Sequence, residues 1–260
     1  MLYARDILFV DYSENLLSDE KKIAEIRSNI QQGDIYIVKN VVDKAFLKQI
    51  RNYLIQIGKN SLPNYRTILP GCPNFHRMND EDDRAYVKGC FHQFVFFPWN
   101  QDVFHLFEKF RFVYYLKNLL SGLRSDIFLS REPEEDCIAR LAFQYYPKNK
   151  GYLNAHADPV DYHQLTVPTM MLSKKGEDFL EGGAYVMSTK KNKIYVDDFL
   201  DWGDVVYFNA SVIHGVDPVD PGVEENWLSF EGRWILLFAV NKLASNQRIG
   251  QSVDVKTELA

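Results

Sequence analysis

The chain has 260 residues, a length that favours a single domain with a sizeable core. Hydrophobic residues make up 46% and charged residues 25%, as in ordinary globular proteins, whereas aromatic residues reach 14%. The net charge of −5 supplies no broad basic face of the kind that duplex nucleic acid requires, so we expect no nucleic-acid partner, although a local basic groove is compatible with this balance. No apolar run approaches the roughly 18 residues of a membrane helix, and the first residues lack the basic start and apolar run of a signal peptide.

Three cysteines occur, at Cys72, Cys90 and Cys137. An odd number at wide spacing argues against a disulfide framework and against a zinc–thiolate site. We therefore expect reduced thiols in a cytoplasmic protein that does not associate with a membrane.

Two helices with a strand between them are predicted near the N-terminus. Ser18 and Asp19 can begin the first helix, and Gly33 is its predicted stop. Residues 34–39 contain a run of β-branched and aromatic residues, Ile-Tyr-Ile-Val, and predict a short strand. Asp43 then begins the second helix.

The second helix carries one apolar stripe and is predicted to end at Gly58. Three prolines and an acidic run predict long loops over 59–90, where substrate contacts are often found. A third helix is predicted to begin at Asn100 and to end at Gly122. Residues 1–124 are therefore expected to form helical support and loops.

From about residue 125 the helical periodicity gives way to short apolar runs separated by Gly, Pro, Asn and Asp. Many short strands at this spacing predict a sandwich or barrel. We expect one domain over 1–260, mainly β with N-terminal helices, in which 125–245 form the β core packed against a helical layer. The predicted runs are Ile127–Leu129, Ile138–Tyr146, Gln164–Leu172, Ala184–Met187, Ile194–Val196, Val205–Phe208 and Trp234–Val240.

Two of the six histidines have neighbours suited to metal binding. His156-Ala157-Asp158 puts an imidazole and a carboxylate on the same side of an extended segment, because positions i and i+2 point the same way. His214 closely follows an apolar run and could approach from a neighbouring strand. Two histidines and one carboxylate are the facial triad of non-haem Fe(II), which leaves positions open for other ligands. No ligand spacing is found for the remaining histidines, His76, His92, His105 and His163.

The sequence around these residues resembles the Fe(II)/2-oxoglutarate-dependent dioxygenases, in particular their prolyl-hydroxylase-like and phytanoyl-CoA-hydroxylase-like members. The resemblance covers roughly residues 138–241, and its four segments occur in the family's order. It implies a double-stranded β-helix, or jelly roll. The segments are Gln144–Pro147 leading to His156-Ala157-Asp158, Glu181–Val186, Trp202–Phe208 with His214–Val219, and Gly232–Phe238.

The resemblance also implies roles for four residues. His156, Asp158 and His214 would bind Fe(II) as the catalytic metal. Arg233 would pair with the distal carboxylate of 2-oxoglutarate, to which its planar fork of donors is suited. An arginine at the start of a buried apolar strand would be costly without an anionic partner, which favours a bound dianion.

Other contacts with the co-substrate follow from the same resemblance. Tyr146 matches a tyrosine that touches the co-substrate, and Gln144 shares its strand face. The hydroxyl residue that relatives place two positions after the arginine is replaced here by Ile235, and the tyrosine of prolyl hydroxylases by Met171. A hydroxyl must therefore come from elsewhere, and Thr169 is the candidate because it shares the strand face of Met171.

The predicted activity is hydroxylation of an unactivated C–H bond, with O2 and 2-oxoglutarate consumed and succinate and CO2 released. A small molecule or natural-product intermediate is the expected substrate, and a carrier-bound group or a protein side chain are alternatives. Ascorbate is expected to serve as a reductant in vitro. Asp158 argues against halogenation, because halogenating relatives have a small residue at that position; desaturation and ring formation would use the same ligands.

Two other classes of protein are considered. One is a cupin-like metal enzyme that does not use 2-oxoglutarate, against which Arg233 argues. The other is a catalytically silent binding domain on the same scaffold, against which the complete triad argues.

Overall fold

The computed structural model describes residues 1–65 and 67–255. In this part of the chain the helices are α1 (Glu20–Gln31), α2 (Lys44–Asn60), α3 (Leu106–Lys109) and α4 (Arg111–Leu120), with 3-10 turns η1 (Glu14–Ser18), η2 (Val103–His105) and η3 (Val196–Phe199). The strands are β1 (Ile7–Asp11), β2 (Ile35–Lys39), β3 (Phe75–Asp80), β4 (Gly89–Phe96), β5 (Cys137–Pro147), β6 (Tyr152–Ala157), β7 (Thr169–Met171), β8 (Gly183–Met187), β9 (Lys193–Tyr195), β10 (Val205–Tyr207), β11 (His214–Asp217), β12 (Gly232–Lys242) and β13 (Val253–Asp254).

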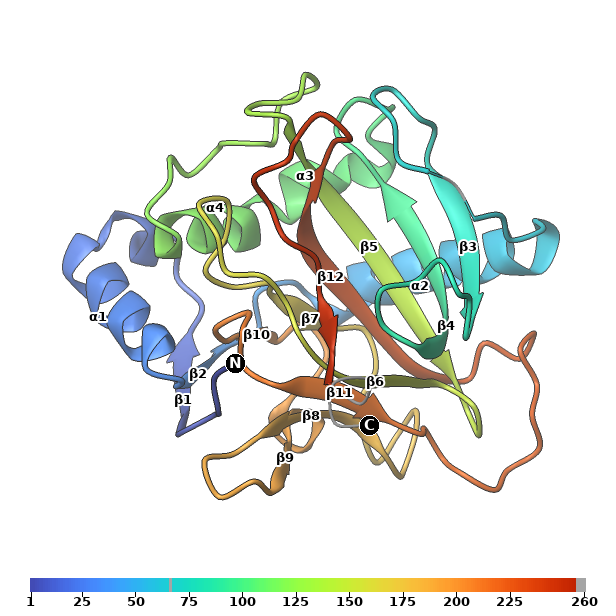
Figure 1. Cartoon of the computed structure of the whole chain (residues 1–260). Coiled ribbons are helices and arrows are strands. Elements are labelled where there is room, and N and C mark those ends of the chain that lie inside the picture. Colours follow the sequence, from blue (N-terminus) through green and yellow to red (C-terminus); the bar gives the residue numbers. More distant parts are fainter. Residues whose placement is uncertain (66, 256–260) are drawn as a thin grey trace.

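Within these residues, thirteen strands form one curled sheet with helices packed against one side (Figure 1). The strand order is β1-β2-β10-β7-β12-β5-β4-β6-β11-β8-β9, with β3 added to β4 and β13 to β6. The sheet curls so that β8 and β11 face β5 and β12, and side chains from both halves share one apolar cluster. The predicted fold class, a jelly roll with a helical layer, is confirmed.

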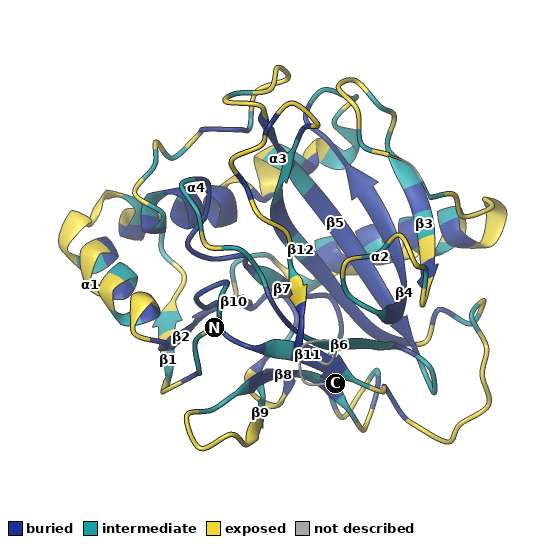
Figure 2. Ribbon diagram, viewed as in Figure 1, coloured by how far each residue is buried: buried dark blue, intermediate teal, exposed yellow. Residues whose placement is uncertain are grey.

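The long central strands β5 and β12 are buried on both faces (Figure 2). One face of β5 packs against the helical layer, where Phe143 meets Phe110 at a ring distance of 6.3 Å. The other face carries Gln144 and Tyr146 into the curl of the sheet. Because alternate residues of a strand point to opposite faces, one strand supports both the helical core and the interior of the barrel.

The predicted N-terminal elements are found, with one change at a helix end. Asp19 accepts a hydrogen bond from the backbone of Lys22, and Asp43 caps α2 in the same way. Helix α2 does not end at Gly58 but continues to Asn60. A Cβ on Gly58 would lie 2.3 Å from the ring of Phe230, so this glycine permits close packing against α2 rather than ending it.

The first 124 residues contribute four strands as well as helices. β2 pairs with β10, and β4 lies between β5 and β6, so these strands are part of the same sheet as the later ones. The loop predicted over 59–90 contains β3, which forms a hairpin with β4. Its residues are polar because Arg77 and Asn79 line an internal cavity, so the apolar alternation that marks a strand is missing.

Two other predictions differ from the structure. Ile127–Leu129 forms turns and no strand. The helix predicted from Asn100 is broken into η2, α3 and α4, because Phe104 and His105 have positive φ angles of 59° and 53°. The ring of Phe104 packs edge-on against Tyr53, which the break makes possible.

A pair of buried histidines joins β3 to β4. His76 Nε2 and His92 Nδ1 are 2.8 Å apart, and both rings lie on the helical side of the sheet. Burial lowers the pKa of His76 to about 4 and, with the neighbouring ring, the pKa of His92 to about 3. Both imidazoles are therefore neutral in the folded protein at neutral pH.

We expect the free energy of unfolding of the metal-free protein to fall as the pH is lowered from 6.5 towards 4. The unfolded chain takes up protons at its histidines near their ordinary pKa of 6.5, whereas the folded chain takes them up only near pH 4 and below. Each buried neutral histidine then contributes a slope of up to about 1.4 kcal/mol per pH unit. Urea unfolding between pH 7 and pH 5 measures this slope. H92Q should reduce it, and a slope unchanged from wild type would contradict the buried, neutral state of His92.

Candidate metal centre

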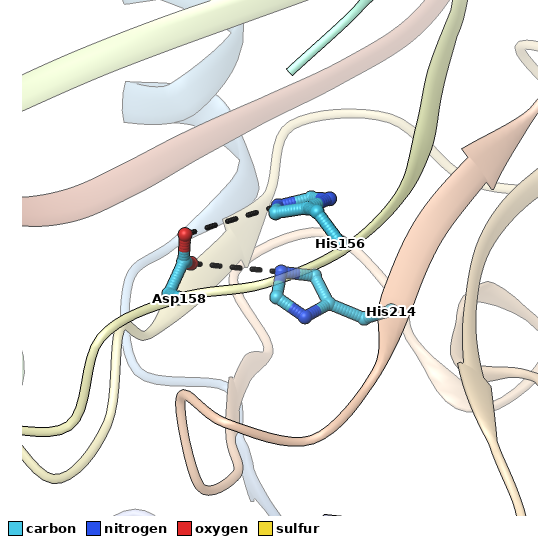
Figure 3. A group of neighbouring side chains, drawn as sticks. All are labelled: His156, Asp158 and His214. Carbon is cyan, nitrogen blue, oxygen red and sulfur yellow. Dashed lines mark ion pairs between the residues drawn. The ribbon is translucent and has the colours of Figure 1, made fainter. Parts of the chain in front are cut away.

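Two neighbouring strands bring three potential metal ligands together. β6 and β11 are antiparallel, and their register places His156 directly opposite His214. Residues opposite each other in an antiparallel pair share a face, and the two rings are 4.1 Å apart. Asp158 follows the end of β6 and turns its carboxylate towards both rings (Figure 3).

The geometry of these three side chains suits a single ion. Asp158 Oδ1 lies 3.9 Å from His156 Nε2, and Oδ2 lies 3.6 Å from His214 Nε2. Nδ1 of His156 is 2.8 Å from the carbonyl of Asn154, and Nδ1 of His214 is 2.8 Å from that of Val212. These carbonyls hold the Nδ1 protons, so both Nε2 lone pairs point to the same place. Within the described ranges no other group of His, Cys, Asp or Glu meets this ligand spacing.

The charge states also suit metal binding. Burial raises the pKa of Asp158, but His156, His214, the Ser252 hydroxyl and Arg140 outweigh burial, so that the pKa lies below its ordinary value. Burial and the neighbouring His156 lower the pKa of His214 to about 4. At neutral pH the site therefore offers a carboxylate and a neutral His214 imidazole, a donor set that fits Fe(II) and other divalent ions.

The triad opens into a cavity of about 740 Å³ inside the curled sheet. All of the residues that the sequence assigned to the metal and the co-substrate line this cavity, so the structure brings them together. They are His156, Asp158, His214, Arg233, Tyr146, Gln144 and Thr169.

Arg233 has a carboxylate partner that the sequence analysis did not identify. Its Nε donates to Asp197 Oδ2 at 2.6 Å and its Nη2 to Oδ1 at 2.9 Å, with both side chains almost fully buried. Burial lowers the pKa of Arg233, but Asp197 more than compensates and raises it above its ordinary value. The buried Nη1 has no hydrogen-bond partner among the described residues. Arg233 therefore does not need a bound anion to balance its charge, contrary to the prediction from the sequence. Its Nη1 is still free to donate a hydrogen bond to a ligand.

The ion pair between Arg233 and Asp197 explains why two glycines, Gly182 and Gly183, stand next to each other at the start of β8. Gly183 has φ of +98°, and a Cβ there would lie 2.4 Å from Asp197 Oδ2. Its neighbour Gly182 has φ of +73°, and a Cβ there would lie 1.9 Å from the carbonyl of Pro218. Glycine at both positions lets the chain pass close enough for Asp197 to accept from Ala184 N and to reach Arg233.

The other three residues that the sequence assigns to the co-substrate, Tyr146, Gln144 and Thr169, line the same cavity as Arg233. The guanidinium carbon of Arg233 lies 5.4 Å from the centre of the Tyr146 ring, and β12 places the two residues opposite each other. The Tyr146 hydroxyl donates to Gln144 Oε1 at 2.8 Å. Thr169 reaches the same cavity from β7, which pairs with β12.

Two residues of this site were missed by the sequence analysis. Asp197 is one of two adjacent acids, and nothing in its spacing to Arg233 marks it. Ser252 donates its hydroxyl to Asp158 Oδ1, from a segment that leads into β13, which pairs with β6 beside His156. Both contacts join residues far apart in the chain, so no local motif could reveal them.

Comparison with known proteins supports the fold. No protein-family model matches the chain, and no curated protein matches its sequence. A Neurospora crassa protein, solved in complex with alpha-KG and thymine, has 13% identity and a TM-score of 0.54, over 97% of this chain and 95% of that one. JOX2 in complex with 2OG, Fe and JA has 14% identity and a TM-score of 0.57, over 98% and 80%. The dioxygenase for auxin oxidation in rice has 14% identity and a TM-score of 0.51, over 92% and 83%.

At these identities the likeness establishes a shared fold. In the structures of the Neurospora crassa protein and of JOX2 that fold holds alpha-KG or 2OG, and in JOX2 it also holds Fe. The comparison therefore agrees with the resemblance found in the sequence. No helix in the described part of this chain is long and apolar enough to cross a membrane.

We expect S252A to weaken Co(II) binding by about 10- to 100-fold, the usual effect of removing a group that orients a metal ligand. The reason is that the Ser252 hydroxyl fixes the Asp158 carboxylate in the direction of both histidines. Titration with Co(II), followed by its visible absorption, measures the affinity. S229A removes a hydroxyl that donates to Asn226 O in an exposed loop and should leave the affinity unchanged. Equal affinity in S252A and wild type would contradict this role.

Proposed function

We propose that this protein is an Fe(II)/2-oxoglutarate-dependent oxygenase that hydroxylates a C–H bond of a small molecule. The observation that carries the proposal is that the triad opens into the same cavity as Arg233, on a fold shared with the Neurospora crassa protein and JOX2. When bound, Fe(II), 2-oxoglutarate and O2 supply the oxidation of the C–H bond, with succinate and CO2 as co-products.

The proposed role of the triad is to hold the metal with one face left open. His156 and His214 offer Nε2 because their Nδ1 atoms face backbone carbonyls. Asp158 adds one negative charge and is held by Ser252. Three protein ligands on one face leave the remaining coordination positions for the co-substrate and O2.

Arg233 is the proposed partner of the distal carboxylate of 2-oxoglutarate. Asp197 fixes the guanidinium through Nε and Nη2, which leaves the buried Nη1 to donate to the co-substrate. Tyr146, Gln144 and Thr169 line the same cavity and are the proposed sources of further hydrogen bonds. A guanidinium held by a carboxylate is already oriented before the co-substrate arrives, which reduces the entropy lost on binding.

Hydroxylation is the proposed outcome because Asp158 fills the ligand position that halogenating relatives leave to a halide. A small-molecule substrate fits a cavity of about 740 Å³, which lies within the usual range for small ligands. The Neurospora crassa protein and JOX2 were crystallised with the small molecules thymine and JA.

A metal enzyme that does not use 2-oxoglutarate is the second candidate. The observation in its favour is the pair between Arg233 and Asp197, which already neutralises the buried guanidinium. A second carboxylate at Arg233 would also be repelled by Asp197. The unpartnered Nη1 favours the first candidate, because a buried donor without an acceptor is destabilising.

We also infer that residues 1–260 form one domain and that the protein is cytoplasmic. Strands from before and after residue 124 alternate in one sheet, which supports a single folding unit. The cytoplasmic assignment rests on the odd number and wide spacing of the cysteines in the sequence.

We expect purified protein with Fe(II), ascorbate and 2-oxoglutarate to form succinate. D158A and H214A should abolish this, because two remaining ligands hold the ion poorly. Zn(II) in place of Fe(II) should bind and give no succinate, because zinc has no accessible redox change. Succinate from the zinc-loaded protein, or near-wild-type succinate from either variant, would refute the oxygenase proposal.

Loss of Arg233 should raise the concentration of 2-oxoglutarate required. A buried charge-assisted pair is worth roughly 2–5 kcal/mol, or about 30-fold or more in affinity. R233L alone would leave Asp197 buried and unpaired, so the informative variant is R233L/D197L, in which an apolar pair replaces an ion pair. Thermal unfolding checks that this variant folds. Unchanged 2-oxoglutarate affinity in a folded double variant would mean that another residue binds the distal carboxylate.

A further inference from the structure

Two arginines line the cavity without a carboxylate partner. Arg77 comes from β3 and Arg140 from β5, and the side chains of both border the cavity that contains the triad. In the described part of the chain no carboxylate oxygen lies within 4.0 Å of either guanidinium. Arg77 rests on the ring of Tyr65, 5.2 Å from its centre, and this contact does not neutralise its charge.

The strand register explains why both face inwards. Arg77 lies opposite Gln93 on β4, and Gln93 lies opposite Gln144 on β5, so the three share one face of the sheet. Arg140 is four residues before Gln144 and therefore has the same orientation. The sheet thus presents a polar row to the cavity, where an apolar row would be the stable choice in a closed core.

Several polar atoms in this row lack partners. Nε of Arg77, Nε of Arg140 and Oε1 of Gln93 are buried and make no hydrogen bond to any described residue. Buried polar atoms in native proteins are otherwise almost always paired. The two Nε–H groups are donors that an anionic ligand can satisfy, which indicates that a ligand supplies their missing partners.

The other two described arginines that line this cavity are neutralised by carboxylates of the protein itself. Arg233 is paired with Asp197, and Arg84, at the wall of the cavity, is held by Asp82 through Nε and Nη2. Lys117 is a buried lysine that no carboxylate of the described residues pairs with, and it lies outside this cavity. The lack of a carboxylate partner is therefore specific to Arg77 and Arg140 among the described arginines that line the cavity.

Arg140 lies far from Arg233 along the paired strands. Arg233 is opposite Tyr146 and Arg140 is opposite Ala239, so six residues of paired strand separate the two arginines. At about 3.3 Å per residue this is roughly 20 Å. A 2-oxoglutarate molecule bound at Arg233 and the triad therefore leaves the part of the cavity at Arg140 for a different ligand.

Two like charges near each other are unfavourable, and here Asp158 and Asp82 offset the charges of Arg140 and Arg77 only from beyond ion-pair distance. Burial, and then the charge of Arg77, lower the pKa of Arg140 to about 10, so both groups stay protonated at neutral pH. A partly buried pair of like charges creates a positive potential in this part of the cavity, which favours an anion.

We propose that Arg77 and Arg140 bind an anionic group, a carboxylate or a phosphate, of the molecule that this protein oxidises. The planar donors of arginine match the oxygens of either group. Gln93 is placed to add a hydrogen bond from its amide. Calling the ligand the substrate rests on the proposed function, whereas the existence of the anion site does not.

Binding to the metal-free protein tests the site without reference to turnover. The probes are benzoate, its neutral analogue benzamide, and phenyl phosphate, measured by calorimetry in the presence of EDTA. Wild type should bind benzoate at least about 10-fold more tightly than benzamide, the gain expected for a hydrogen-bonded ion pair. Tighter binding of phenyl phosphate than of benzoate supports the site and identifies phosphate as the group; the reverse identifies carboxylate.

Matched variants locate the site. R77Q and R140Q should each weaken benzoate binding about 10-fold and change benzamide binding less than about 2-fold. R84Q, which removes an arginine already held by Asp82, should leave benzoate binding unchanged. Equal affinity for benzoate and benzamide in wild type overturns the proposal, as does a loss in R84Q equal to that in R140Q.

Thermal unfolding separates a ligand-binding role from a structural one. R140M removes a partly buried charge that has no carboxylate within ion-pair distance among the described residues, so its melting temperature should equal or exceed that of wild type. A clear decrease would show that Arg140 stabilises the fold and would overturn the assignment. If benzoate binds as expected but no succinate forms with Fe(II) and 2-oxoglutarate, the anion site stands and the proposed function fails.

Discussion

The pairing of β6 with β11 is the constraint on which the candidate site depends. It sets His156 directly opposite His214 on one face, and a slip of one residue would turn one of the rings away. In each case Nδ1 meets the carbonyl two residues earlier, so the same local geometry orients both rings. β13 pairs with the other edge of β6, and Ser252, just before β13, donates a hydrogen bond to Asp158. The last described residues therefore orient the third potential ligand.

The interior of the curled sheet separates positive charge into two places. At one end Arg233 is neutralised by Asp197, which keeps it fixed and leaves one nitrogen unused. Elsewhere in the cavity Arg77 and Arg140 have no carboxylate within ion-pair distance among the described residues. The first arrangement suits a co-substrate that must always be held in one orientation. The second stores unfavourable electrostatic energy that an anionic ligand would relieve, and stability given up in this way is typical of binding sites.

The sequence predicts the parts of this protein that depend on local patterns. The cap of α2 at Asp43 and the strand β12 are both determined by residues close in the sequence, so the sequence predicts them. The shared orientation of His156 and Asp158 follows from the geometry of an extended strand alone. The strand β3 could not be predicted, because its inward residues are polar and serve a cavity instead of a core. Asp197 could not be assigned to Arg233 because only the folding of the sheet brings η3 beneath β12. The prediction that Gly58 ends the helix is wrong, because this glycine allows Phe230 to pack closely against α2. That contact is tertiary and cannot be read from neighbouring residues.

The central claim is that one cavity holds a metal ion and 2-oxoglutarate side by side. Visible absorption of the Co(II)-loaded protein tests it most directly, since the d–d bands of Co(II) respond to a change of ligands and turnover is not required. The account predicts one Co(II) per chain, and a change in the bands that saturates at one equivalent of 2-oxoglutarate in wild type. Bands that remain unchanged by 2-oxoglutarate, in a protein that binds Co(II) through His156, Asp158 and His214, would contradict it.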